Sequence, residues 1–538
     1  MHFEEILEEV GGFHRFQFLV LHILSIPRVI LPLHFLLHNF ISAVPQHRCA
    51  LAHLDHRYAD PGPRLLPRDP DGSPSSCRQF PEPENFNSSG TGSNESVPCQ
   101  HGWTYDRTLF NSTTATEWDL VCDSKNLNQA LATFFFLGVM MGAVLFGYLA
   151  DRFGRKPMLL VSFVSSCVFG VAAAFSTSFL MFAVSRTLSG VALTGMSITT
   201  LALTVEWTGV NHRTFSGTIL SLGWSLGNML LALLAFLLRD WRHLMLAVTA
   251  PCLAAIATWW WVPESARWLL VNGRVEEAQQ VLQRCARINR RTLKLDIEAL
   301  HKVTMNEQPS KEHSYLDLVR TPKLRKITIC LGIVWFAVAS TYYGISFNIT
   351  GFGLNVFLTQ FIYGAIEIPA KVGTYLLLDH IGRRNGQAWS LILSGVLIGV
   401  NTAIPTDYAG VRTGVAVCGK GFSEAAFTIA FLYTAELFPT VVRQCGLGYT
   451  SFLGRLGGSM APLLIMLKDV WSSAPPLVFS LVAVVSGCVV FLLPETLRVR
   501  LPETIQDVEQ DRNALTETEM SEMSEMNSRP LVSHQEEN

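Results

Sequence analysis

A polar stretch of this sequence, Gly147-Tyr-Leu-Ala-Asp-Arg-Phe-Gly-Arg-Lys156, separates two long apolar runs. A shorter relative of it, Asp379-His-Ile-Gly-Arg-Arg384, begins 228 residues after Asp151. Three further pairs keep almost the same offset, at 230 or 231 residues: Glu206 with Glu436, Arg213 with Arg443, and Pro263-Glu-Ser with Pro494-Glu-Thr. Four correspondences at nearly one offset indicate an internal duplication. We therefore predict a chain of two equivalent halves.

The composition excludes an ordinary soluble protein. Only 16% of the 538 residues are charged and 49% are hydrophobic, whereas soluble domains carry about 25% charged residues. A net charge of −2 leaves no basic excess that would neutralise nucleic-acid phosphates. Apolar runs of about the 20 residues that a helix needs to cross a bilayer occur twelve times. The sequence predicts an all-α membrane protein with twelve transmembrane helices in two pseudo-symmetric six-helix halves.

The N-terminus is acidic and polar over residues 1–15, and an apolar run follows. It lacks the basic start, short apolar core and cleavage site of a signal peptide, so we expect the first helix to be retained. Arg28 within this helix either packs against other helices or lines a wet cavity. The predicted segments are the first transmembrane helix at 16–42, a loop at 43–126, helices two to six at 127–262, a second loop at 263–325, helices seven to twelve at 326–493, and a mostly disordered acidic tail at 494–538.

The loop at 43–126 has the features of an extracellular segment. It contains three glycosylation sequons, at Asn87, Asn94 and Asn111, and their use requires exposure outside the cell. Four cysteines in an oxidising compartment form two disulfides, with three connectivities open. These cysteines are Cys49, Cys77, Cys99 and Cys122; the other seven are expected to be free, and no spacing indicates a metal site.

An extracellular first loop and an even number of spans place both termini in the cytosol. Basic residues agree, because they concentrate in the stretch at 147–156, in the stretch at 379–384 and in the loop at 263–325, all cytosolic in this topology. Apolar residues from Val275 to Ala286 recur at helical spacing, so the loop at 263–325 is predicted to contain an amphipathic helix.

These motifs carry a family resemblance. The stretch at 147–156 is similar to the loop signature of the major facilitator superfamily. Together with the first loop, Pro263-Glu-Ser-Ala-Arg-Trp-Leu-Leu and Glu436-Leu-Phe-Pro-Thr-Val-Val-Arg, it resembles the organic ion transporters of that superfamily. The resemblance runs from Phe3 to the segment after Leu501. It implies the major facilitator fold, with a substrate site at the membrane midplane between the halves.

The resemblance also implies roles for particular residues. Salt bridges that latch one conformation are expected from Asp151, Arg152 and Arg155 in the first half, and from Asp379, Arg383 and Arg384 in the second. Arg455 lies where the organic cation branch has an acidic residue, and a guanidinium pairs well with carboxylate or phosphate, so it favours anions. Aromatic residues at positions that line the site in related anion transporters are Trp224, Trp335, Tyr342, Tyr343 and Phe427.

Two further charged positions have more than one interpretation. Lys371 either binds an anion or forms an ion pair with Glu367, one helical turn earlier. Glu424 replaces a small residue of the better-known anion members. It either pairs with Lys420 in its own helix or offsets the positive field, so that zwitterions and weak bases are admitted as well as anions.

The expected function is polyspecific, sodium-independent exchange of small organic anions by alternating access. The resemblance suggests nucleobase-like and cyclic-nucleotide anions, urate-like compounds, carboxylates and creatinine-like weak bases as substrates, and a basolateral plasma membrane of liver or kidney cells. No nucleotide-binding or catalytic motif is present, so we expect no enzyme, cofactor or metal, and a monomer. The alternatives are an organic cation or zwitterion transporter, a monocarboxylate or urate exchanger, and a non-transporting receptor on the same fold.

Overall fold

The computed structural model of the chain is dominated by helices. It describes residues 3–50, 67–68, 74–80, 96–209, 212–291, 300, 315–348, 355–405, 407–469, 471–497, 499, 502 and 504–509. The chain divides into two compact units. The N-terminal unit comprises Arg15–Trp207 and Ile219–Ser265, and the C-terminal unit comprises Met1–His14, Thr208–Thr218 and Ala266–Asn538.

The N-terminal unit is a bundle of long apolar helices. Close packing of α5 on α7 depends on glycine, because a Cβ added at Gly142 would lie 2.5 Å from the carbonyl oxygen of Val191. Arg28 of α2 turns toward α7, and its Nη1 donates to the Ser197 hydroxyl at 3.3 Å. The helices are α2 (Arg15–Phe35), α3 (His38–Ile41), α5 (Lys125–Phe153), α6 (Arg155–Ala174), α7 (Phe179–Trp207), most of α8 (Arg213–Leu237), α9 (Trp241–Thr249), α10 (Pro251–Thr258) and the 3-10 turn η3 (Trp259–Trp261).

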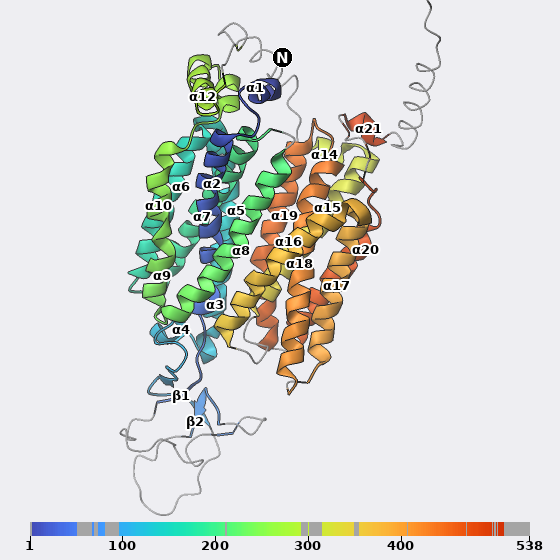
Figure 1. The fold of residues 1–538 in the computed structure, drawn as a ribbon. Helices are drawn as coiled ribbons and strands as arrows, with labels where there is room; N and C mark the ends of the chain where they lie inside the picture. Colours follow the sequence, from blue (N-terminus) through green and yellow to red (C-terminus); the bar gives the residue numbers. More distant parts are fainter. Residues whose placement is uncertain are drawn as a thin grey trace, which may run out of the picture. The chain divides into compact units, whose positions relative to one another are not determined.

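The long loop of the N-terminal unit is tied by two disulfides, Cys49–Cys99 and Cys77–Cys122. These bonds select one of the three connectivities that the sequence leaves open. Two short antiparallel pairs accompany them at one end of this bundle (Figure 1). They are β1 (His47–Cys49) with β4 (Trp103–Tyr105) and β2 (Arg78–Gln79) with β3 (Val97–Pro98), followed by α4 (Thr114–Glu117) and η1 (Cys122–Ser124).

The C-terminal unit contains a second bundle. Its helix α15 is the most deeply buried of the long apolar helices, and Trp335, Tyr433 and Phe438 are among the large side chains of its core. Gly457 lets α19 approach α15, because a Cβ there would lie 2.4 Å from the carbonyl oxygen of Phe336. The helices are α15 (Pro322–Phe347), α16 (Val356–Ile381), α17 (Arg383–Ala403), α18 (Ala409–Leu437), α19 (Arg443–Ile465), η4 (Met466–Asp469) and α20 (Ala474–Val490).

Short helices of the C-terminal unit lie outside the long bundle. The predicted amphipathic helix is confirmed as α12 (Val275–Ile288), with Val275, Ala278, Leu282, Cys285 and Ala286 buried. It lies beside α1 (Phe3–Glu9) (Figure 1), and the Asn289 side-chain amide donates to the Val10 carbonyl at 2.9 Å. The polar N-terminus therefore contains a helix that the sequence analysis did not predict. The remaining ones are α11 (Ala266–Val271), α14 (Asp317–Arg320) and α21 (Ile505–Glu509).

The predicted fold class is confirmed. Among the described residues, 10 helical segments are long and apolar enough to cross a membrane. Two further helices complete the twelve. Helix α17 begins with Arg383 and Arg384 and is the less apolar of the two, whereas α20 is strongly apolar but only 17 residues long. Each of the two units thus contributes six membrane-length elements.

Candidate functional site

Four charged side chains meet inside the C-terminal unit, and we call them the four-charge cluster: Glu367 and Lys371 of α16, and Lys420 and Glu424 of α18. Their residues are 0%, 2%, 0% and 6% exposed, respectively. Lys371 Nζ lies 3.2 Å from Glu424 Oε1 and 3.6 Å from Glu367 Oε2, and Lys420 Nζ lies 3.3 Å from Glu367 Oε1. Each charge therefore has an opposite charge within contact distance, and the cluster as a whole is neutral.

Helix α15 completes this cluster with two hydroxyl groups. The Tyr342 hydroxyl donates to Glu367 Oε1 at 2.7 Å, and Lys420 Nζ donates to the Ser346 hydroxyl at 2.7 Å. Lys420 Nζ also lies 3.1 Å from the centroid of the Tyr342 ring, which is a cation–π contact. Buried charges are tolerated when they are paired and their remaining hydrogen-bonding capacity is satisfied. The cluster fulfils both conditions.

The structure decides between the pairings that the sequence suggested. The Lys371–Glu367 pair within α16 is confirmed. The alternative pair within α18, Lys420 with Glu424, is not among the ion pairs that either residue forms. Both residues contact α16 instead, because Lys420 pairs with Glu367 and Glu424 pairs with Lys371. The packing of α18 against α16 offers each of them a partner across the helix interface, which a single helix does not reveal.

Arg455 of α19 is in a different situation. Its Nη1 donates to the carbonyl and hydroxyl oxygens of Ser451, one turn earlier in the same helix. In the part of the chain that the structure describes, no carboxylate lies within 4 Å of its guanidinium. Gly454, next to it, faces an aromatic side chain, since a Cβ there would lie 3.0 Å from Cε3 of Trp335. Arg455 is thus a half-buried cation that has hydrogen bonds within its own helix and no ion pair among the described residues.

Aromatic rings of α15 and α18 form one continuous group next to these charges. The Tyr342 ring centroid lies 5.4 Å from Phe427 and 5.2 Å from Tyr343, and Phe427 lies 5.8 Å from Trp335. Phe431 extends the group, 4.6 Å from Trp335, and was not predicted from the sequence. Four of the five predicted aromatic residues are therefore brought together. The fifth, Trp224, belongs to the N-terminal unit, where its ring packs on Phe35 at 5.6 Å.

The first signature stretch forms an ionic cluster in the N-terminal unit. Arg155 Nη1 lies 2.6 Å from Asp151 Oδ1, and Arg155 Nη2 lies 3.2 Å from Glu206 Oε1. The Glu264 carboxylate accepts the backbone N–H groups of Arg155 and Lys156, at 3.1 and 3.2 Å. Burial raises the pKa of the Glu264 carboxyl above its ordinary value, and these N–H donors act in the opposite direction.

The second signature stretch repeats this arrangement in the C-terminal unit. Arg383 Nη1 lies 2.9 Å from Asp379 Oδ1, and Arg383 Nε lies 3.3 Å from Glu436 Oε2. The Glu495 carboxylate accepts the backbone N–H groups of Arg383 and Arg384, at 2.8 and 3.1 Å. The repeat in the sequence is therefore a repeat of contacts, and it includes two carboxylates, Glu264 and Glu495, whose role the sequence analysis did not foresee.

Not every residue of the signature stretches joins an ion pair. Within the described ranges, the Arg152 side chain bonds to the Tyr148 hydroxyl at 3.1 Å, and the Arg384 side chain forms no salt bridge. Both stretches turn at a glycine with positive φ, Gly154 at 99° and Gly382 at 88°. A Cβ at Gly382 would lie 2.6 Å from Glu495 Oε2, so glycine is required there for both backbone and space.

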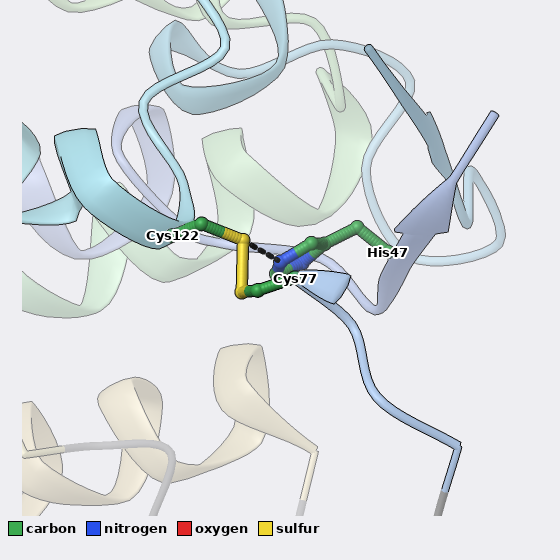
Figure 2. Close-up of side chains that lie close together, drawn as sticks. All are labelled: His47, Cys77 and Cys122. Carbon is green, nitrogen blue, oxygen red and sulfur yellow. Dashed lines mark hydrogen bonds between the residues drawn. A yellow bond between two sulfur atoms is a disulfide. The ribbon is translucent and has the colours of Figure 1, made fainter. Parts of the chain in front are cut away.

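His47, Cys77 and Cys122 have ligand-type atoms within 4.8 Å of one another, as metal sites do (Figure 2). Cys77 and Cys122 are joined in a disulfide, with His47 Nε2 3.9 Å from Cys122 Sγ. Metal binding requires thiolates, so the oxidised pair does not supply ligands. Of the predicted glycosylation positions, Asn111 is described and exposed in the same loop, whereas Asn87 and Asn94 lie outside the described residues.

Comparisons with known proteins place these features in a family. Residues 85–507 match the family described as "Sugar (and other) transporter". The chain is 49% identical to "Solute carrier family 22 member 7" of Bos taurus over 97% of its length and 99% of the relative's, with the same figures for the Homo sapiens protein. It is 40% identical to "Solute carrier family 22 member 6-B" of Xenopus laevis, with 95% of each chain covered.

The fold has solved counterparts. The partially occluded inward-open xylose transporter XylE from E. coli matches with a TM-score of 0.61 at 15% identity, covering 89% of this chain and 98% of that one. At this identity the match shows the fold alone. The resemblance to organic ion transporters of the major facilitator superfamily is confirmed, as is a particular likeness to organic anion transporter 2, which is solute carrier family 22 member 7. These relatives are solute transporters and not enzymes.

Proposed function

The chain belongs to solute carrier family 22, within the sugar and other transporter family, and is a multi-pass membrane transporter of the organic ion class, and we propose that it exchanges small organic anions. The observation that carries the proposal is Arg455, a cation with no carboxylate partner in the described chain. It directly follows Gly454, which packs on Trp335. The four-charge cluster is neutral, so Arg455 leaves this region with one net positive charge. Such a region favours anions, and a guanidinium can bind a carboxylate through two parallel hydrogen bonds.

The aromatic group supports planar substrates. Rings of Trp335, Tyr342, Tyr343 and Phe427 provide broad apolar faces and, through the tyrosines, polar edges. Ligand sites in proteins combine such apolar surfaces with a few polar groups that fix orientation. We propose nucleobase-like and cyclic-nucleotide anions, urate-like compounds and carboxylates as the substrate class.

The four-charge cluster supplies the second determinant of selectivity. Lys371 and Lys420 are engaged by Glu367 and Glu424, so we propose that they act on the substrate through the balance of the cluster and not as separate anion sites. Glu424 is the most exposed member at 6%. In this proposal its carboxylate admits weak bases of the creatinine type in addition to anions.

Transport is proposed to follow alternating access, without sodium coupling and in exchange for a counter-anion. The ion pairs of Arg155 and Arg383 support this mechanism, because such pairs can form in one conformation and separate in another. We place the protein, as a monomer, in the plasma membrane, with both termini cytosolic and a basolateral location in liver or kidney epithelium.

Radiolabelled uptake in cells tests the proposal. Cells expressing the chain receive orotate, cyclic GMP or a quaternary ammonium ion at two membrane potentials. We expect saturable uptake of the two anions, which is lost in Arg455→Asp. The control variant Arg325→Asp, which reverses the charge of an exposed arginine of α15, should keep this uptake. Cell-surface labelling verifies that each variant reaches the membrane.

The other outcomes separate the alternatives. Potential-driven uptake of the ammonium ion would replace the anion proposal by an organic cation or zwitterion transporter. Anion uptake that survives Arg455→Asp would remove its main support. Surface protein without uptake of any of the three compounds would favour a non-transporting receptor on the same fold.

A further inference from the structure

The N-terminal unit contains a buried cation that the sequence analysis did not single out. Arg186 lies in the first third of α7 and is 3% exposed. Its Nη2 donates to the carbonyl oxygen of His34 at 3.0 Å, and its guanidinium carbon lies 4.4 Å from the centroid of the Phe135 ring. Among the described residues, Nη1 has no hydrogen-bond partner, and no carboxylate lies within 4 Å of the side chain.

A small cavity lies next to this guanidinium. It is lined by residues of the same unit and has room for about one water-sized particle. Arg186 and His38 are the only polar side chains in its lining. The other lining residues are apolar: Phe35, Ile41, Leu131, Ala132, Phe135, Phe136 and Phe182.

The energetics require a compensating group. An unpaired charge inside a protein costs several kcal/mol, because water is removed and nothing replaces it. The backbone carbonyl and the Phe135 ring offset part of this cost, since each presents partial negative charge to the cation. They leave the N–H groups of Nη1 without an acceptor. The cavity is too small for an organic anion, so its occupant is a single small species that accepts hydrogen bonds from Nη1. A monatomic anion would do this and would also balance the charge of Arg186.

We propose that the cavity beside Arg186 binds a single chloride ion. The anion accepts hydrogen bonds from Nη1 of Arg186, and His38 is the second polar group in reach. The site lies wholly within the N-terminal unit, on residues that the proposed organic-anion site does not use. It therefore makes the N-terminal unit chloride-dependent whatever the transported substrate is.

Thermal unfolding of the purified full-length protein in detergent tests this. Sodium chloride, bromide and gluconate are compared at equal ionic strength. A ligand that binds only the folded state raises the melting temperature in proportion to the logarithm of its concentration above the dissociation constant. We expect chloride and bromide, but not gluconate, to raise the melting temperature of the wild type.

Three variants localise the effect. In Arg186→Gln, the chloride concentration that gives a half-maximal rise in melting temperature is expected to be about tenfold higher or more. This corresponds to the loss of one charge-assisted hydrogen bond. Arg107→Gln, at an exposed arginine of the same unit, keeps the wild-type response. Ala132→Val fills the cavity while leaving Arg186 in place, so it decides the question if Arg186→Gln does not fold.

Two results would overturn the proposal. Absence of a halide-specific shift in the wild type would mean that the cavity holds water. An equal halide shift in the wild type, Arg186→Gln and Ala132→Val would mean that chloride binds elsewhere. Arg455→Gln is expected to retain the shift even though it is expected to lose anion uptake, so failure of one proposal leaves the other untouched.

Discussion

Neutralising Glu367 is the most direct test of the ionic arrangement in the C-terminal unit. Its carboxylate lies 3.3 Å from Lys420 Nζ and 3.6 Å from Lys371 Nζ. It also accepts a hydrogen bond of 2.7 Å from the Tyr342 hydroxyl. The change Glu367→Gln preserves the shape of the side chain and removes its charge. The cluster then carries one uncompensated positive charge in a site that is closed to water.

The structure sets the size of the effect. Removing one partner of a buried ion pair costs about 3–5 kcal/mol. Lys371 keeps its ion pair with Glu424, at 3.2 Å, so Lys420 is the lysine that mainly loses its partner. We therefore expect a loss of stability at the lower end of this energy range. For a unit of 150–250 residues, each kcal/mol corresponds to roughly 2–4 °C, so the apparent melting temperature should fall by about 6–12 °C.

Melting of the purified protein in detergent, with a double-variant cycle, measures this. Removing Lys420 as well, in Glu367→Gln/Lys420→Met, restores neutrality, so the double variant should be more stable than the sum of the two single losses by at least about 1.5 kcal/mol. Glu276→Gln, at an exposed acid of α12, serves as control. If Glu367→Gln melted at the wild-type temperature, or if the two single losses simply added, the charge balance would not stabilise the four-charge cluster.

Three further predictions follow from local geometry. Gly382→Ala should reduce surface expression several-fold, because the backbone φ of 88° disfavours a side chain and the Glu495 carboxylate leaves no space for a Cβ. A Cβ at Gly373 meets nothing within 4 Å, so Gly373→Ala should express normally. Equal surface labelling of the two variants would contradict this. Cys77→Ser should cost about 2–5 kcal/mol and lower the melting temperature of the purified protein, while Cys418→Ser, at an exposed free thiol, should not. Glu424→Ala should lower the uptake ratio of a creatinine-like base to a carboxylate about tenfold if its carboxylate attracts the base, and an unchanged ratio would end that role for Glu424.

The duplicated frame was predictable from the sequence because its signals are local. Charged stretches at one offset, apolar runs of membrane length and the Val275–Ala286 periodicity each depend only on neighbours in the chain. The two ionic clusters of the signature stretches followed from the same repeat. Their carboxylate caps, Glu264 and Glu495, did not, although both sit in repeated Pro-Glu motifs, since their hydrogen bonds to distant backbone N–H groups exist only once the helices have packed.

The interior of the site depends on how helices are rotated against one another. Lys420 and Glu424 are one turn apart and look like a pair, yet α18 faces α16 and both residues find partners there. Arg186 gave no sequence signal that distinguishes it from Arg28, because both are single arginines in apolar helices. The difference is tertiary: both arginines donate a hydrogen bond to another helix or its carbonyl, and the packing of the helices shows that Arg186 also lines a cavity.

Charge in the two interiors follows a different rule from charge in the signature stretches. In both units an arginine at the start of one helix pairs with an aspartate in the last turn of the preceding helix and with a glutamate of a third helix, so the duplication is retained in contacts as well as in sequence. Inside the bundles the two units differ, because the N-terminal unit buries the single cation Arg186, whereas the C-terminal unit buries the neutral four-charge cluster. A motion that both halves share needs matching ion pairs, whereas recognition of a substrate without internal symmetry needs unlike walls. The divergence of the interiors is therefore what we expect if the signature stretches serve the conformational change and the C-terminal unit supplies most of the substrate selectivity.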